Sequence, residues 1–291
     1  MKRFALLFFI IIVLNNLNSA DIKYDLTIYH KEKSYAIPYC FYNNDTLLCY
    51  DNKVLFFWNI KGEKKTIYTT NYDMFSLDVK NNKLIFTKMY HDLGDKIIIL
   101  DLISKKEEDL SNLELTDLPS NVYWIDNNSE KIIFQDIQNN KTSEDDKIQV
   151  SIFNLKTKEK QVLFSDSLLY NSYNNILLIH NLQKEKKEET KGNLFLIYNL
   201  ESNKKLYLKS NHEAIGGKAI LFKNTSVLYT EGDHLFYLTP EIEKPIEIKI
   251  KGITKIIDLK YNFNSDLLAI IGDDKRGERY LIFCKLVLFK D

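Results

Sequence analysis

The sequence predicts an all-β protein: a six-bladed β-propeller with four antiparallel strands per blade and a ring closed by the N-terminal strand. Three observations support this prediction. A strand-like motif recurs every 40 to 53 residues along the chain. A polar turn and a second apolar run precede each copy. After the first twenty residues, no segment shows the period of an amphipathic helix.

Composition already excludes several other classes. The chain has 291 residues, of which 45% are hydrophobic, with 40 basic and 40 acidic side chains. Disordered chains are less hydrophobic and more highly charged, and a small disulfide scaffold has many more than the 3 Cys present. A balanced charge also argues against a nucleic-acid partner, because such proteins usually carry a basic excess.

Residues 1–20 are predicted to be a secretory signal peptide. Lys2 and Arg3 precede an unbroken apolar run at residues 4–14, and a short polar, small-residue stretch follows. The run is shorter than the ~20 residues of a spanning helix, so no stable membrane span is expected. Asn18 is an imperfect cleavage signal and leaves a retained anchor as the alternative. Residues 21–291 are then a single propeller domain, either periplasmic or secreted.

The repeat has a conserved layout: an apolar run, then Asp or Asn, then Leu or Ile, then in most copies a Lys-rich turn. Its clearest copies lie at residues 54–60, 97–102, 150–155 and 194–200, with weaker ones at 235–239 and 280–285. The turns that precede these runs are polar and mostly contain Asn, and they begin at Asn43, Asn81, Asn127, Asn174, Asn224 and Asn264. Asn and Asp tolerate positive φ, so these segments are predicted to be hairpin turns.

Each unit supplies four strands, here named A to D in chain order, because a further strand-like run precedes each turn. The sixth unit lacks a clear turn before Val287 and therefore lacks its fourth strand. Residues 22–30 alternate like a strand and stand before the first unit. We expect them to supply the outer strand of the sixth blade, which would leave no long exposed sheet edge. An open β-solenoid is the competing architecture.

One unit contains the segment Asn264-Ser265-Asp266-Leu267-Leu268-Ala269, followed by an apolar strand and a Lys-rich turn. This order of elements resembles the repeats of TolB-type six-bladed propellers and the related WD40-like repeats. The resemblance extends over residues 21–291. It implies a propeller fold, an exported location and a partner-binding role. The chain differs from TolB in having no room for a separate N-terminal α/β domain and in its Asn-rich turns.

Searches for chemistry give no predicted catalytic residue, metal site or cofactor. The chain contains no nucleophile elbow, phosphate-binding loop, His-Glu-x-x-His or Cys-x-x-Cys pattern. Its five His fall in different units, and the segment from His91 to Asp95 has few carboxylates for a hard cation. Adjacent acids such as Asp145-Asp146 and Asp273-Asp274 are the only hint of glycosidase-like chemistry.

The connections between the second and third strands (B–C) vary most in length. In a propeller, the B–C loops share one face with the D–A connections between blades, so this face is predicted to bind a partner. The mature chain keeps only two Arg, Arg276 and Arg279, beside Asp273 and Asp274. With His91 and His212, these residues form the predicted partner-binding set. The alternative interpretation is an Arg279–Asp273 pair that closes a hairpin.

Cys40 and Cys49 lie on either side of the first polar turn, so a cross-strand disulfide and two buried free thiols are both compatible with the sequence. We expect an exported, non-enzymatic scaffold that binds a protein or envelope component. It would be a monomer or a subunit of a hetero-complex. The alternative is a glycan-active hydrolase or lyase with acids at the channel mouth.

Overall fold

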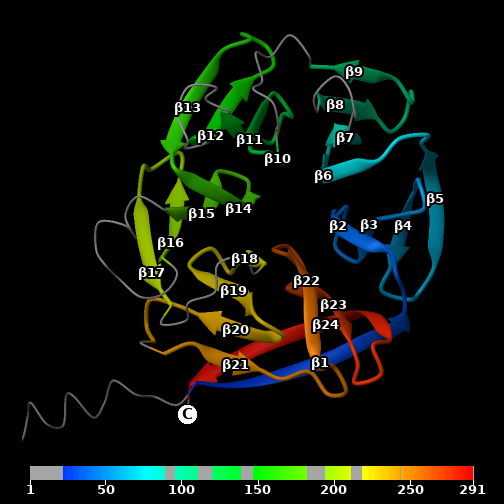
Figure 1. The fold of residues 1–291 in the computed structure, drawn as a ribbon, viewed down its shortest axis with the longest axis vertical. Helices are drawn as coiled ribbons and strands as arrows, with labels where there is room; N and C mark the ends of the chain where they lie inside the picture. Colours follow the sequence, from blue (N-terminus) through cyan, green and yellow to red (C-terminus); the bar gives the residue numbers. More distant parts are fainter. Residues whose placement is uncertain are drawn as a thin grey trace, which may run out of the picture.

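The structure is a computed structural model that describes residues 22–88, 96–110, 120–138, 147–181, 194–210, 218–242 and 244–290. These residues form 24 strands in six four-stranded antiparallel sheets, which are arranged in a ring (Figure 1). The predicted six-bladed β-propeller is confirmed. The predicted signal peptide, residues 1–20, lies outside the described residues.

Strands A to D run from the centre of the ring to its rim in blades 1 to 5. Blade 1 contains β2 (Ile37–Phe41), β3 (Thr46–Asp51), β4 (Val54–Asn59) and β5 (Lys64–Thr69). Blade 2 contains β6 (Met74–Lys80), β7 (Lys83–Lys88), β8 (Lys96–Asp101) and β9 (Glu107–Asp109). Blade 3 contains β10 (Ser120–Trp124), β11 (Lys131–Gln138), β12 (Lys147–Asn154) and β13 (Lys160–Ser165).

The remaining blades follow the same order. Blade 4 contains β14 (Ser167–Tyr173), β15 (Ile176–Asn181), β16 (Leu194–Asn199) and β17 (Lys205–Lys209). Blade 5 contains β18 (Ala219–Phe222), β19 (Ser226–Glu231), β20 (His234–Leu238) and β21 (Ile246–Ile248). Blade 6 contains β22 (Lys255–Asn262), β23 (Leu267–Asp273), β24 (Arg279–Lys290) and, from the other end of the chain, β1 (Ile22–Lys33).

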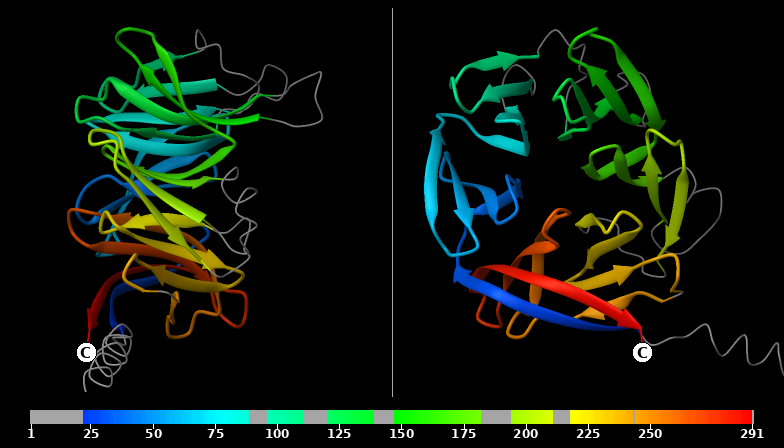
Figure 2. Two further views of the ribbon diagram at one scale, coloured as in Figure 1. Left: turned by 90° about the vertical axis from the view of Figure 1, so that its left-hand side faces the viewer. Right: turned by 180° about the vertical axis from the view of Figure 1, so that it is seen from behind.

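The two ends of the chain close the ring together. β1 pairs antiparallel with β24 from Ile22 opposite Lys290 to Lys33 opposite Tyr280, and the two strands lie side by side in both figures (Figure 2). β24 needs no turn before Val287 because it is one continuous strand of 12 residues. The predicted closure by the N-terminal strand is therefore confirmed, with a strand that extends beyond the expected 22–30.

Local backbone chemistry explains the hairpins. Turn residues with positive φ include Asn81, Asn174, Asn224 and Asp266, as expected for residue types that tolerate this region. At the turns between strands C and D, the side-chain oxygens of Asn59, Asp101, Asn154 and Asn199 each accept two backbone N–H groups. The Asp or Asn of the repeat is thus a turn cap.

The core consists of six apolar clusters, one at each junction between neighbouring blades. Trp58, for example, is fully buried between blades 1 and 6, and Phe134 between blades 2 and 3. Inner strands such as β7, β8 and β23 bury side chains on both faces because both faces meet another blade, whereas the outer strand β9 is exposed. This explains why most runs are continuously apolar and not alternating.

Cys40 and Cys49 are both free. A bulge after Pro38 shifts the register, so Cys49 lies opposite Pro38 and Cys40 lies opposite Leu48. Cys49 packs between blades 6 and 1, whereas Cys40 packs between blades 1 and 2. Their side chains therefore point to opposite faces of the sheet, and the structure excludes the cross-strand disulfide.

Candidate functional site: a groove between blades 3 and 4

The predicted partner-binding residues on the β23–β24 hairpin have different local roles. Arg279 Nε donates to Asp273 Oδ1 at 3.0 Å, and the two residues are register partners. Asp274 Oδ1 accepts the backbone N–H groups of Arg276 and Glu278, at 2.8 and 3.0 Å. The pair expected by the alternative interpretation is thus present. Of the four predicted residues on this hairpin, only Arg276 is exposed.

His91 and His212, the other members of the predicted set, lie outside the described residues. So do the acidic pair Asp145-Asp146 and most of the long B–C loops. The partner-binding role of this face therefore stays a prediction. Among the described residues, no group of three or more His, Cys, Asp or Glu could hold a metal ion. No helix in that part of the chain is long and apolar enough to cross a membrane.

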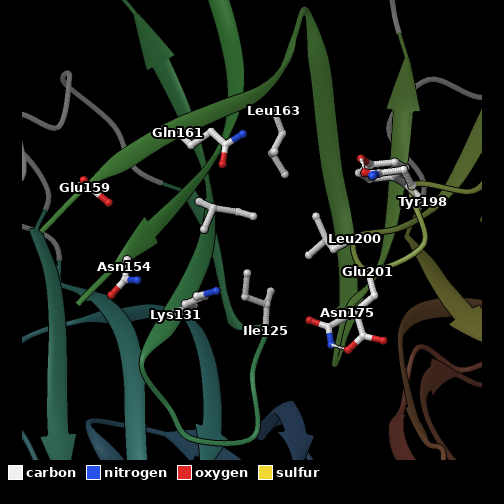
Figure 3. A pocket seen from close by; sticks show the side chains of 12 residues that line it. Ile125, Lys131, Asn154, Glu159, Gln161, Leu163, Asn175, Tyr198, Leu200 and Glu201 are labelled. Atoms are coloured by element: carbon white, nitrogen blue, oxygen red, sulfur yellow. Dashed lines mark hydrogen bonds between the residues drawn. The ribbon is translucent and has the colours of Figure 1, made fainter. Parts of the chain in front are cut away.

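A hollow lies on the opposite face, where the A–B and C–D turns gather. It is a groove of about 480 Å³ between blades 3 and 4 (Figure 3). An apolar floor is formed by Ile125, Ile152, Leu163, Tyr198 and Leu200. The volume falls within the range of ordinary ligand sites.

Polar side chains surround this floor. Blade 3 contributes Lys131, Asn154, Glu159 and Gln161, and blade 4 contributes Asn175, Glu201 and Asn203. Asn175 Nδ2 donates to Glu201 Oε1 at 2.5 Å, and Tyr198 Oη donates to Asn203 Oδ1 at 2.7 Å. The charged residues that line the groove are one Lys and two Glu, so its walls are slightly acidic.

A comparison with the junction between blades 1 and 2 shows how the groove arises. There, Tyr42 stacks on Phe57 with ring centroids 4.2 Å apart. In blade 3, Ile125 corresponds to Tyr42, because each directly follows the last paired residue of its A strand. Ile152 corresponds to Phe57, because each lies two residues before the turn cap of its blade. Two smaller side chains replace a stacked aromatic pair, and space is left between the blades.

A second difference keeps the space open. Lys105, four residues after the turn cap of blade 2, reaches back to blade 1 and donates to the carbonyl of Ile67 at 2.9 Å. Asn203 occupies this place in blade 4, with the same positive φ. Its side chain is too short to reach blade 3 and instead bonds Tyr198 of its own blade. The groove therefore results from specific side chains and not from irregular strands.

A smaller hollow lies at the centre of the ring on the same face. Bulges in the innermost strands turn the following residues toward the ring axis, and Cys40, Asp78 and Asn171 line this hollow. Burial raises the pKa of Asp78 to about 6. Asp258, at the matching position of blade 6, lies 3.3 Å from Lys260 Nζ. Both carboxylates are thus held by the structure around them.

Comparisons with known proteins were made for sequence and for fold. No protein-family model and no curated protein matches the sequence. The fold matches 523 chains of solved structures. One is TolB from Acinetobacter baumannii, with a TM-score of 0.51 and 10% identity over 81% of this chain. This chain spans 62% of the TolB chain.

Enzymes share the fold as well. A luciferin-regenerating enzyme matches with a TM-score of 0.58 and 9% identity, over 90% of this chain and 95% of that one. A prolyl endopeptidase matches with a TM-score of 0.51 and 12% identity, over 85% of this chain and 40% of that one. The protein is therefore a six-bladed β-propeller, and its predicted resemblance to TolB-type propellers is confirmed for the fold. Likeness at such identities carries no function.

Sequence reasoning missed the groove, and it named the channel mouth only as the place of acids in the alternative function, without identifying the residues that line it. The signal for the groove was available in the repeats: Asn203 stands where blade 2 has Lys105, and Ile125 where blade 1 has Tyr42. Reading it requires knowing which positions of two different blades face each other.

Proposed function

We propose that this protein is an exported, non-enzymatic interaction scaffold that holds an extended segment of a protein partner in the groove between blades 3 and 4. The single observation that carries this proposal is the groove itself, with its apolar floor and its polar walls on two rigid blades. The predicted signal peptide supports the exported location.

The chemistry of the groove suits a peptide. Successive side chains of an extended segment point in opposite directions, so every second side chain faces the floor of the groove. Apolar residues at these alternate positions can pack on Ile152, Leu163 and Leu200. Backbone N–H and C=O groups of the segment meet amide side chains such as Gln161 and Asn175. Glu159 and Glu201 favour a segment that also carries Lys or Arg.

The test is a selection of random displayed peptides on the purified protein, followed by affinity measurements for the selected sequences. Enriched peptides are expected to contain spaced apolar residues and a basic residue, with Kd values of about 1 to 100 μM. Asn203→Lys recreates the lysine of blade 2 and is expected to close the groove, because Leu163 stands where Ile67 stands in blade 1. Binding should weaken at least about tenfold.

Ser202→Lys is the matched control, since it adds the same charge one residue away at an exposed position. It should leave affinity within about twofold of the unmodified protein. Peptides that bind Asn203→Lys as tightly as the unmodified protein would remove the groove from the proposal. Loss of binding with Arg276→Ala would instead place the site on the opposite face.

A further inference from the structure

The hollow at the centre of the ring is a second, independent cavity. It has a volume of about 150 Å³, enough for about five water molecules. The innermost strands of blades 1, 2, 3, 4 and 6 line it, so five of the six blades contribute to its wall. Its mouth is marked by exposed residues of the A–B turns, Tyr42 and Asn264.

The charged groups of this cavity are already engaged. Asp78 accepts backbone N–H groups with both carboxylate oxygens, from Val79 at 2.9 Å and from Trp124 at 2.8 Å. The ammonium of Lys260 pairs with Asp258 at 3.3 Å. A charged ligand would have to break one of these contacts, so the site offers little to an anion or a cation.

Neutral hydrogen-bonding groups, in contrast, are available. The Ser172 hydroxyl lines the cavity, is buried, and has no hydrogen-bond partner among the described residues. Asn171 Oδ1 makes only a 3.4 Å contact, with the amide of Leu221. A buried hydroxyl without a partner costs free energy unless a water or a ligand satisfies it.

The walls of the cavity are aromatic. Tyr173 and Phe263 stack with centroids 3.7 Å apart, and Tyr42 keeps 37% of its surface exposed at the mouth. Rings of this kind pack well against the C–H faces of sugars. Side-chain hydroxyl and amide groups that both donate and accept match ligands whose own groups are hydroxyls.

We propose that the channel mouth binds a neutral saccharide, one ring deep, with Ser172 and Asn171 as hydrogen-bonding residues and Tyr42 at the rim. The site does not depend on the groove between blades 3 and 4, because the two share no lining residue. The proposal is one of binding and requires no bond to be made or broken.

Saturation-transfer difference NMR on the mature protein tests it. The probes are methyl glycosides of glucose, galactose, mannose and N-acetylglucosamine, each at about 10 mM so that Kd values of about 1 mM are detected. At least one should give a signal. Ser172→Ala should weaken its binding roughly fivefold to tenfold. The melting temperature should not fall, because Ser172 Oγ bonds no described group.

Ser172→Leu fills the cavity and should abolish the signal, whereas Asn203→Lys should leave it intact. Choline and inorganic phosphate serve as charged probes. Three outcomes would each overturn the proposal. They are the absence of a signal for all four sugars, the binding of a charged probe in their place, and a sugar signal that persists in Ser172→Leu. A signal that Asn203→Lys abolishes would overturn the separation of the two sites.

Discussion

Lys80 of blade 2 donates a hydrogen bond of 3.0 Å to the side-chain oxygen of Asn174 in blade 4. Blades 2 and 4 are not neighbours, because blade 3 lies between them in the ring. Tyr173 Oη of blade 4 likewise donates to Asn264 Oδ1 of blade 6 at 3.1 Å, although blade 5 lies between these two blades. Blades of a propeller mostly contact their neighbours, so these two bonds brace the channel mouth across the ring.

Removal of the first brace should destabilise the fold modestly. Lys80→Met keeps the aliphatic stem and loses the hydrogen bond, so the free energy of unfolding should fall by about 1 kcal/mol. The melting temperature should then drop by roughly 2 to 4 °C in a chain of this size. Lys65→Met, at an exposed position of β5, is the control. Equal melting temperatures for both variants would contradict the bracing role.

Asp78 should make stability depend on pH. Burial raises its pKa from the ordinary 3.8 to about 6. Between these values the folded protein binds more protons than the unfolded chain, so the free energy of unfolding falls as pH rises through this window. The contribution of Asp78 is complete below about pH 4 and lost above about pH 6, and it amounts to roughly 3 kcal/mol at most.

Asp78→Asn fixes this position in a neutral form and should remove the effect. Urea unfolding at pH 4.5 and pH 7.5 measures it: relative to the unmodified protein, the variant should gain roughly 2 kcal/mol at the higher pH. Asp45→Asn, at an exposed turn, is the control. Parallel stability curves for Asp78→Asn and the unmodified protein would contradict the prediction.

Closure of the ring should be essential for folding. Deletion of residues 21–31 removes most of β1, exposes the edge of β24 and breaks the bond from the Lys249 amide to Tyr24 Oη, which is 2.9 Å long. We expect aggregation, or a melting temperature lower by roughly 10 °C, because several kcal/mol are lost. A truncated protein that melts within about 3 °C of the mature chain would disprove this.

The two Arg of the β23–β24 hairpin should behave differently. Arg279→Ala breaks a partly exposed pair with Asp273 and should cost less than about 1 kcal/mol of stability. Arg276→Ala should leave stability unchanged, because its side chain is exposed. Thermal melts of both variants measure this difference. A partner that binds this face would be captured less well by Arg276→Ala at an unchanged melting temperature.

The N-terminal segment should be removed in the native compartment. Residues 4–14 should be absent from the mature protein, whose predicted first residue is Asp21, directly before β1. N-terminal sequencing of the protein from its native source measures this. A chain that begins at Met1 in a cytoplasmic fraction would contradict export.

The sequence by itself determined the architecture. Three local patterns carried this information. They are the six copies of an apolar run, four of them with an Asp or Asn cap, the polar turns, and the strand at residues 22–30 that has no partner in its own unit. Each depends on backbone preferences and on apolar burial within one unit. They are therefore readable from short windows, and they fixed the number of blades and the place of closure.

The tertiary structure decided which parts can bind. The open junction between blades 3 and 4 depends on Ile125, Ile152 and Asn203, which come from two blades and matter only where their side chains meet. Bulges that each insert one extra residue precede Asp78 and Asn171 and place Cys40 and Cys49 on opposite faces of their sheet. A strand has a side-chain period of two, so a single inserted residue reverses every direction after it. No apolar pattern records such an insertion, and only the packed ring reveals it.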